Sequence, residues 1–162
     1  MGVKVILQDI KKLETGALIV GFFEDVRPLK GLAGELDWLL CGALSSLIIK
    51  HKLSGALGEL ALLTSQGKVP ASKIFMLGLG PRRGISLETL RNAACSAAAA
   101  VAGVGAASAA LEHFITPELS PEAAVSSLRQ GLAEGSQGSS MEISLLAPDA
   151  ASYEMISRSL TV

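Results

Sequence analysis

The sequence predicts an α/β fold with three layers, in which helices cover both faces of a mixed central sheet. Short apolar segments with strand character alternate along the chain with segments whose apolar residues recur at helical spacing. The segment Ala17 to Phe23 is apolar throughout, as expected for a strand covered on both faces. The 162 residues, 49% of them apolar, are enough to form one domain (1–162) with its own core.

The individual elements follow from the positions of apolar runs, glycines and capping residues. The expected strands are residues 3–7, 17–23, 58–64, 73–79, 106–111 and 141–147. The expected helices are residues 32–50, 87 to the glycines at 103 and 105, 121–135, and a last helix after residue 149. Ser86 and Asp149 are suitable N-caps, and Pro121 suits a first helical position.

The helix expected over residues 32–50 carries an apolar stripe centred on Leu36, which should face the sheet. At 100° per residue, the opposite face carries Trp38, Gly42, Ser45 and Ile49. An outward Trp and Ile have two explanations, which the sequence leaves open. A neighbouring loop covers them, or they form an interface with another subunit, where buried Trp is favoured.

Composition excludes several partners. The net charge is −1 and charged residues make up 18% of the chain, so we expect no binding to nucleic acid or to an anionic membrane surface. The uncharged segment 92–111 is mostly Ala, Gly and Ser, which favours a buried helix, a turn and a strand over a membrane span. Cys41 and Cys95 fall within expected helices, and we interpret them as reduced, buried thiols of a cytoplasmic protein.

A glycine-rich turn between an expected strand and helix is the sharpest candidate binding site. Backbone N–H groups and the helix dipole at such a junction favour a small anion such as phosphate. The spacing is not that of the dinucleotide fingerprint, and Pro81 removes one donor. The alternative is a tight turn with two solvated arginines. The candidate residues are Gly78, Gly80, Arg82, Arg83, Gly84 and Ser86.

Catalytic and metal-binding patterns are weak. His51 and His113 have no Cys, His or carboxylate neighbours at ligand spacing, and no nucleophile elbow of the Gly-x-Ser-x-Gly type is present. We therefore expect no metal and no cofactor.

Several segments together resemble the N-terminal domain of the leucyl aminopeptidase family, peptidase family M17. The run ALIVGFFED and the longer run KIFMLGLGPRRGISLETLRNAACSAAAAV carry the resemblance, which covers about residues 1–160. In that family, a strand ending in Gly-Leu-Gly precedes a capped helix with Leu-Arg and an Ala-rich run. The matching positions here are Gly78, Leu79, Gly80, Ser86, Leu90, Arg91 and Ala93 to Ala100.

The resemblance implies a macro-domain-like fold, attached in full-length relatives to a two-metal peptidase domain that forms hexamers. The signature of that domain, Asn-Thr-Asp-Ala-Glu-Gly-Arg, does not occur in these residues, so no catalytic residue is carried over. We expect a non-catalytic accessory domain, paired with further copies of itself or with a peptidase domain. The alternative is a macro-type module that takes a nucleotide or other anion, with Asp25 as a weak counterpart of the Asp that holds adenine in macro domains.

Overall fold

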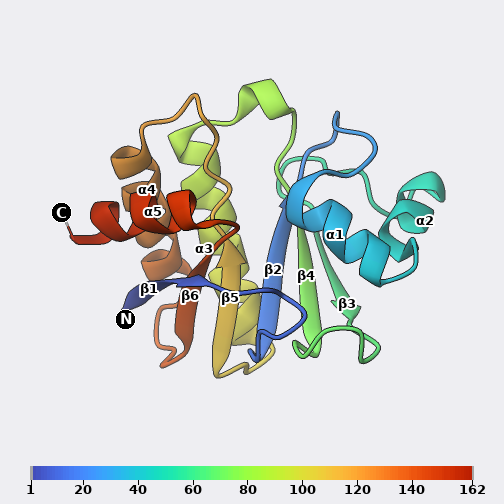
Figure 1. The fold of residues 1–162 in the computed structure, drawn as a ribbon, viewed down its shortest axis with the longest axis horizontal. Helices are drawn as coiled ribbons and strands as arrows, with labels where there is room; N and C mark the ends of the chain where they lie inside the picture. The colour runs from blue at the N-terminus through green and yellow to red at the C-terminus, as the bar shows by residue number, and fades with distance from the viewer. Residues whose placement is uncertain (1, 162) are drawn as a thin grey trace.

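The computed structural model describes residues 2–161 and confirms the expected three-layer α/β architecture (Figure 1). All six expected strands are present, although the third begins two residues later and the fifth is shifted to 108–112. The strands are β1 (Val3–Leu7), β2 (Ala17–Phe22), β3 (Leu60–Thr64), β4 (Lys73–Gly78), β5 (Ser108–Glu112) and β6 (Glu142–Ala147). The helices are α1 (Gly31–Leu39), α2 (Ala43–Ile49), α3 (Leu87–Gly103), α4 (Pro121–Gly135) and α5 (Ala150–Thr161), with a 3-10 turn η1 (Arg82–Gly84).

The six strands form one mixed sheet in the order β1-β6-β5-β2-β4-β3, in which only β3 is antiparallel to its neighbour. One hydrophobic core lies between the sheet and α3, α4 and α5, and a second lies between the sheet and α1 and α2. β2 contributes to both cores, with Ile19 facing the first and Leu18 the second. Its uninterrupted apolar sequence is therefore explained, as predicted, by burial on both faces of the sheet.

The prediction of one helix over residues 32–50 is wrong, because α1 and α2 meet at a bend of 104°. Cys41 and Gly42 between them adopt positive φ values of 56° and 81°, which a continuous helix cannot contain. The carboxylate of Asp37 accepts hydrogen bonds from the backbone N–H and the hydroxyl of Ser45, and so satisfies donors in the first turn of α2. Cys41 is exposed at this corner, so the prediction of a buried thiol is also wrong there, whereas Cys95 is half-buried.

The Ala-rich helix α3 is buried as predicted and packs closely on α4. A Cβ atom added to Gly131 of α4 would lie 2.1 Å from the carbonyl oxygen of Arg91 in α3. The two helices can approach this closely because one presents glycine and the other presents small side chains. The predicted caps hold as well: Ser86 accepts the Thr89 N–H at 3.1 Å, and Asp149 accepts the Ser152 N–H at 2.7 Å.

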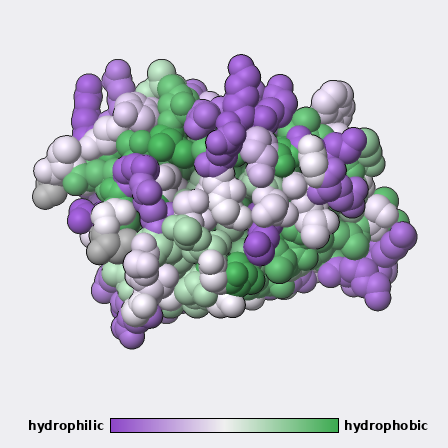
Figure 2. Space-filling view, turned by 90° about the horizontal axis from the view of Figure 1, so that it is seen from below, coloured by the Kyte–Doolittle hydropathy of each residue, from purple (hydrophilic) through white to green (hydrophobic). Residues whose placement is uncertain are grey.

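Within residues 2–161, no single helix has both the length and the hydrophobicity to cross a bilayer; α1 and α2 reach them only together, as a bent pair. The face at the amino ends of the parallel strands is a mixture of hydrophilic and hydrophobic side chains (Figure 2).

Candidate functional site

The carboxyl ends of β2 and β5 separate and leave a crevice in the sheet. The two strands pair only over Ala17–Ile19 and Ala109–Leu111, whereas β2 pairs with β4 along its full length. The chain leaves β2 toward α1 on one face and leaves β5 toward α4 on the other. Ligands of open α/β sheets bind at such a reversal of connection, outside the carboxyl ends of the strands.

Glu112, the last residue of β5, occupies this crevice. Its Oε2 accepts the backbone N–H of Gly21 at 3.0 Å, and so replaces the strand partner that β2 lacks at this point. Burial raises the pKa of the Glu112 carboxyl to about 7, and the Gly21 N–H, which favours the carboxylate, offsets only part of that rise. The site therefore contains a carboxyl group that changes charge near neutral pH.

The residues after Glu112 fold back over the end of β2. His113 Nδ1 accepts the backbone N–H of Ile115 at 2.9 Å, which leaves Nε2 as the protonated nitrogen of the neutral ring. Burial lowers the pKa of His113, while the Asp149 carboxylate acts in the opposite direction. The ring of Phe114 covers Gly21, where an added Cβ would lie 2.6 Å from Phe114 Cε1. Gly21 thus allows this loop to lie against the strand.

A cavity of about 780 Å³ opens in front of Glu112, between α1 and the segments that follow β1 and β6. Its volume is in the range of sites that hold small molecules. Its apolar lining consists of Leu7, Ile10, Leu32, Leu146, Ala147 and Pro148, and its polar lining includes Gln8, Asp9, Glu35, Glu112 and His113. A smaller cavity of about 200 Å³ shares Gly31, Glu112 and His113 with it and extends toward Phe23 and Lys30.

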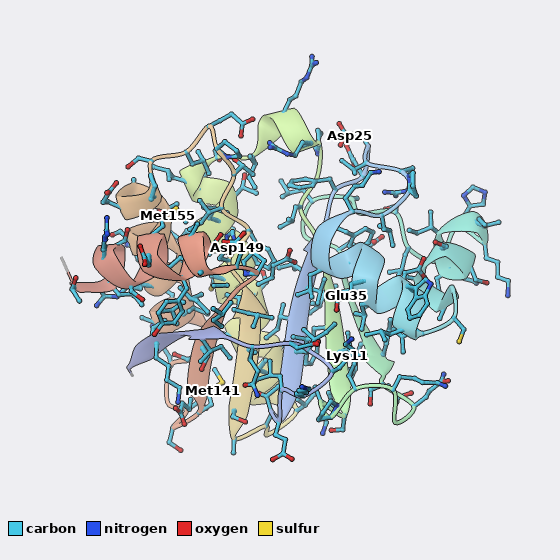
Figure 3. All side chains as sticks on the ribbon, in the orientation of Figure 1. Lys11, Asp25, Glu35, Met141, Asp149 and Met155 are labelled. Carbon is cyan, nitrogen blue, oxygen red and sulfur yellow. The ribbon has the colours of Figure 1, made fainter. Side chains whose placement is uncertain are left out.

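The polar groups of the larger cavity come from separate parts of the chain. Glu35 lies on α1, and Asp9 follows β1, where its carboxylate accepts the Lys11 N–H and pairs with the Lys11 ammonium at 3.6 Å. In Figure 3, Glu35 and Lys11 lie to the right of Asp149, which is at the start of α5. Asp25 stands well apart from them, beside η1.

The predicted glycine turn lies at the same end of the sheet but makes close contacts within the chain. A Cβ on Gly78 would lie 2.0 Å from the Ala56 carbonyl oxygen, and Gly80 has a positive φ of 72°. The N–H groups of Gly78, Gly80 and Gly84 donate to backbone carbonyls. These donors are therefore already satisfied by the protein.

Asp25 and the two arginines complete this arrangement. Asp25 Oδ1 accepts the Arg82 N–H at 3.0 Å, so a carboxylate of the chain itself occupies the position predicted for an anion. The Arg82 guanidinium pairs with Glu118 at 3.2 Å and lies over the ring of Phe23, 5.6 Å from its centroid. Arg83 is exposed. The Ser86 hydroxyl accepts the Thr89 N–H in the first turn of α3.

The four residues of the predicted interface do not share one helical face, because the bend separates them. Trp38, 81% exposed, and Gly42 line a shallow hollow beside Pro28. Ser45 turns toward Asp37, and Ile49, 76% exposed, lies at the far end of α2.

Over the part of the chain that the structure describes, no three His, Cys, Asp or Glu side chains gather in a group that could hold a metal ion. Asp9, Glu35 and Glu112 are the residues that sequence reasoning missed. The signal for Asp9 and Glu112 was a charged residue directly after, or at the end of, an apolar strand, which places a carboxylate at the carboxyl edge of a parallel sheet. Glu35 had no signal beyond its place in an expected helix.

Comparison with known sequences identifies the relatives of this chain. The model of the N-terminal domain of the cytosol aminopeptidase family matches residues 19–140. A probable cytosol aminopeptidase of Geobacter sulfurreducens is 32% identical over 136 residues, which cover 83% of this chain and 27% of that protein. A probable cytosol aminopeptidase of Cyanothece sp. is 41% identical over 81 residues, covering 50% of this chain and 16% of that protein. The chain spans less than a third of the length of these relatives.

Two solved structures share the fold. A mutant of tomato leucine aminopeptidase superposes with a TM-score of 0.72 at 21% identity, over 98% of this chain and 35% of that one. The Oceanobacillus iheyensis macrodomain with ADP superposes with a TM-score of 0.75 at 14% identity, over 97% of this chain and 88% of that one. The fold is thus macro-domain-like, as predicted. Since the family model matches most of the chain, the chain belongs to the cytosol aminopeptidase family, in which it corresponds to the N-terminal domain.

Proposed function

We propose that the chain is a non-catalytic accessory and assembly domain of a cytoplasmic aminopeptidase. The observation that carries this proposal is the match to the N-terminal domain of the family, in proteins more than three times as long. The partner is a second copy of this chain or a peptidase domain, either separate or in the same polypeptide.

The corner between α1 and α2 supports an assembly role. Trp38 exposes 81% of its surface and Ile49 76%, and large apolar side chains exposed to this degree favour contact with another protein. Trp38 also borders a hollow of about 630 Å³ with Pro28 and Leu29, which could receive a side chain of the partner. Trp38 is therefore the residue on which this interface depends most.

The test replaces Trp38 with Glu and measures molecular mass in solution by light scattering, for the chain alone and mixed with a peptidase domain of a relative. We expect the wild-type chain to associate and Trp38→Glu to weaken association about tenfold or more, because a central Trp can contribute 2 kcal/mol or more, roughly, to binding. Val104→Glu, at another exposed apolar position, serves as the control and should retain association. A wild-type chain that stays monomeric in both experiments would contradict the assembly role.

A second candidate function is small-molecule binding of the macro type, and the cavity of about 780 Å³ at the crevice favours it. Structures of the same fold contain ADP, in macrodomains of Oceanobacillus iheyensis and Trypanosoma brucei. The sequence interpretation assigned a nucleotide or anion to the turn from Gly78 to Gly84. For a small molecule in general, the cavity is the stronger location, because the N–H groups of the turn already have partners within the chain.

Titration of ADP-ribose and of inorganic phosphate, followed by backbone amide shifts, tests this second function. A macro-type module should show shifts in the residues that line the cavity, whereas an anion at the glycine turn should shift Arg83 and Ser86. Arg82→Ala combined with Arg83→Ala should weaken only the second kind of binding. If neither ligand moves any of these amides at millimolar concentration, a nucleotide-binding function is ruled out.

A further inference from the structure

The chemistry of the large cavity indicates which class of ligand it accepts. Three carboxylates line it, those of Asp9, Glu35 and Glu112. Among the described residues, its lining includes no Lys or Arg, and burial lowers the pKa of His113, which favours the neutral ring. The remaining walls are apolar. The cavity is therefore suited to an organic cation rather than to a phosphate group, which carboxylates repel.

The charged groups around the cavity leave this balance in place. Lys11 and Lys12 lie beside Asp9, and the Lys11 ammonium and N–H are both engaged with its carboxylate. Lys30 lines the adjoining smaller cavity and forms no salt bridge with Glu112. Asp149, at the start of α5, raises the pKa of His113 through its charge and adds a further negative charge near the cavity. Glu35 forms no salt bridge within residues 2–161. Above the pH at which Glu112 ionises, the side chains that line the larger cavity therefore carry a net negative charge.

Glu112 is the central group of the site. One of its oxygens accepts the Gly21 N–H, and within residues 2–161 the other, Oε1, accepts no hydrogen bond. No cation of the described chain forms a salt bridge with it, although its side chain is half-buried and lines the cavity. A half-buried carboxylate without a counter-charge is destabilising, and an ammonium group that donates to Oε1 would supply that counter-charge.

We propose that the cavity binds a protonated primary amine with an apolar body. The ammonium group donates to Glu112, with Glu35 contributing attraction from α1, and the apolar body packs on Leu7, Ile10 and Leu146. This proposal deepens the small-molecule binding function and rests on it. It differs from that function in assigning a cation, rather than a nucleotide, to the site.

The test compares three probes of similar size and different charge: phenethylamine, 2-phenylethanol and 3-phenylpropionate. Each is titrated into the 162-residue chain at pH 8, followed by calorimetry and by the amide shifts of Gly21, Ile10 and Leu146. We expect the amine to bind at least about tenfold more tightly than the alcohol, and the carboxylate to bind least, because a hydrogen bond between charged groups contributes roughly 1.5–3 kcal/mol. Affinity for the amine should rise between pH 6 and pH 8, since the carboxylate form of Glu112 is the one that attracts it.

Two variants test whether the amine binds in the cavity. Glu112→Gln keeps an acceptor for Gly21 but removes the charge, so it should weaken amine binding about tenfold and abolish its rise with pH. Glu35→Gln, at an exposed position on α1, should weaken it by a smaller factor and provides the test if Glu112→Gln does not fold. Glu14→Gln, at an exposed position between β1 and β2 that does not line the cavity, is the matched control and should leave binding unchanged.

The outcomes separate this proposal from the function on which it rests. Equal affinity for the amine and the alcohol, or amine binding unaffected by Glu112→Gln and Glu35→Gln, overturns the assignment of a cation. ADP-ribose that shifts the cavity amides while the amine does not also overturns it, but leaves small-molecule binding intact. If no probe and no nucleotide shifts these amides, both proposals fail.

Discussion

At the scale of single residues, Glu112 is the group whose environment departs most from that of an ordinary surface carboxylate. It ends a buried strand, faces a cavity and satisfies a backbone N–H where two parallel strands separate. Gly21 makes this possible, because any side chain there would collide with Phe114. The position of Glu112 at the end of β5 and the glycine at position 21 therefore place a carboxyl group in the crevice.

The raised pKa of Glu112 predicts a specific dependence of stability on pH. The pKa is about 7 in the folded chain against a reference value of 4.5, so the folded state holds this proton more tightly. The resulting stabilisation is complete below pH 4.5 and is lost as pH rises through about 7. Glu112→Gln has no such loss. Its stability relative to wild type should thus increase by about 1–3 kcal/mol between pH 4.5 and pH 8, as measured by urea unfolding.

Glu14→Gln is the control for this measurement, because Glu14 is exposed and should show no such trend. A constant difference in stability between Glu112→Gln and wild type across this pH range would show that Glu112 is not in the buried environment described.

At the scale of elements, the corner between α1 and α2 combines a left-handed backbone with one polar contact. The apolar stripe of this segment is compatible with one long helix, and Leu36 and Leu44 are both fully buried. The chain nevertheless turns by 104°, with Gly42 in the left-handed conformation and Asp37 bound to Ser45. Because the bend redirects α2, both helices place leucines in the same core.

The contact between Asp37 and Ser45 should therefore contribute to stability. Ser45→Ala removes the hydroxyl donor, and we expect a loss of about 0.5–1.5 kcal/mol in the free energy of unfolding. Ser46→Ala is the matched control, because Ser46 lies in the same helical turn and its hydroxyl makes no hydrogen bond within residues 2–161. Urea unfolding of the two variants gives the comparison. Equal effects of the two substitutions would show that the contact does not stabilise the corner.

At the scale of the whole molecule, the chain has the fold of the N-terminal domain of an aminopeptidase family, and this fold contains an open crevice. The crevice arises because the connections that leave β2 and β5 run to opposite faces of the sheet. The exposed corner of α1 and α2 projects away from the helices α3 to α5 (Figure 1). A ligand and a protein partner could therefore occupy different parts of the surface at once.

The accessory function predicts that the purified chain releases no amino acid from leucyl substrates, with or without added zinc or manganese. Two-metal hydrolysis requires a set of carboxylates that bridge the ions, and the described residues bring together no group of three possible ligands. A chromogenic leucyl anilide assay, with a full-length relative as positive control, measures this. Metal-dependent turnover that persists through rigorous purification would contradict the accessory function.

Much of the fold could be predicted because local sequence signals and the final structure agree. Ser86, Pro121 and Asp149 begin helices where expected, and the apolar run of β2 lies between two cores. The bend at Gly42 could not be predicted in this way, because a stripe of leucines is equally compatible with one helix or with two.

The sequence by itself determined the alternation of strands and helices, the mixed three-layer class and the family, since these follow from hydrophobic period, capping residues and ordered motifs. Only the tertiary structure decided where the candidate site lies. Asp9, Glu35 and Glu112 are far apart in sequence and line one cavity, because the carboxyl ends of β1 and β5 and the first turns of α1 lie around it. In the same structure, the N–H groups of the glycine turn donate to backbone carbonyls and to Asp25. The spacing of residues in the sequence predicts neither which strands become neighbours nor which N–H groups form hydrogen bonds, because both depend on contacts between distant segments.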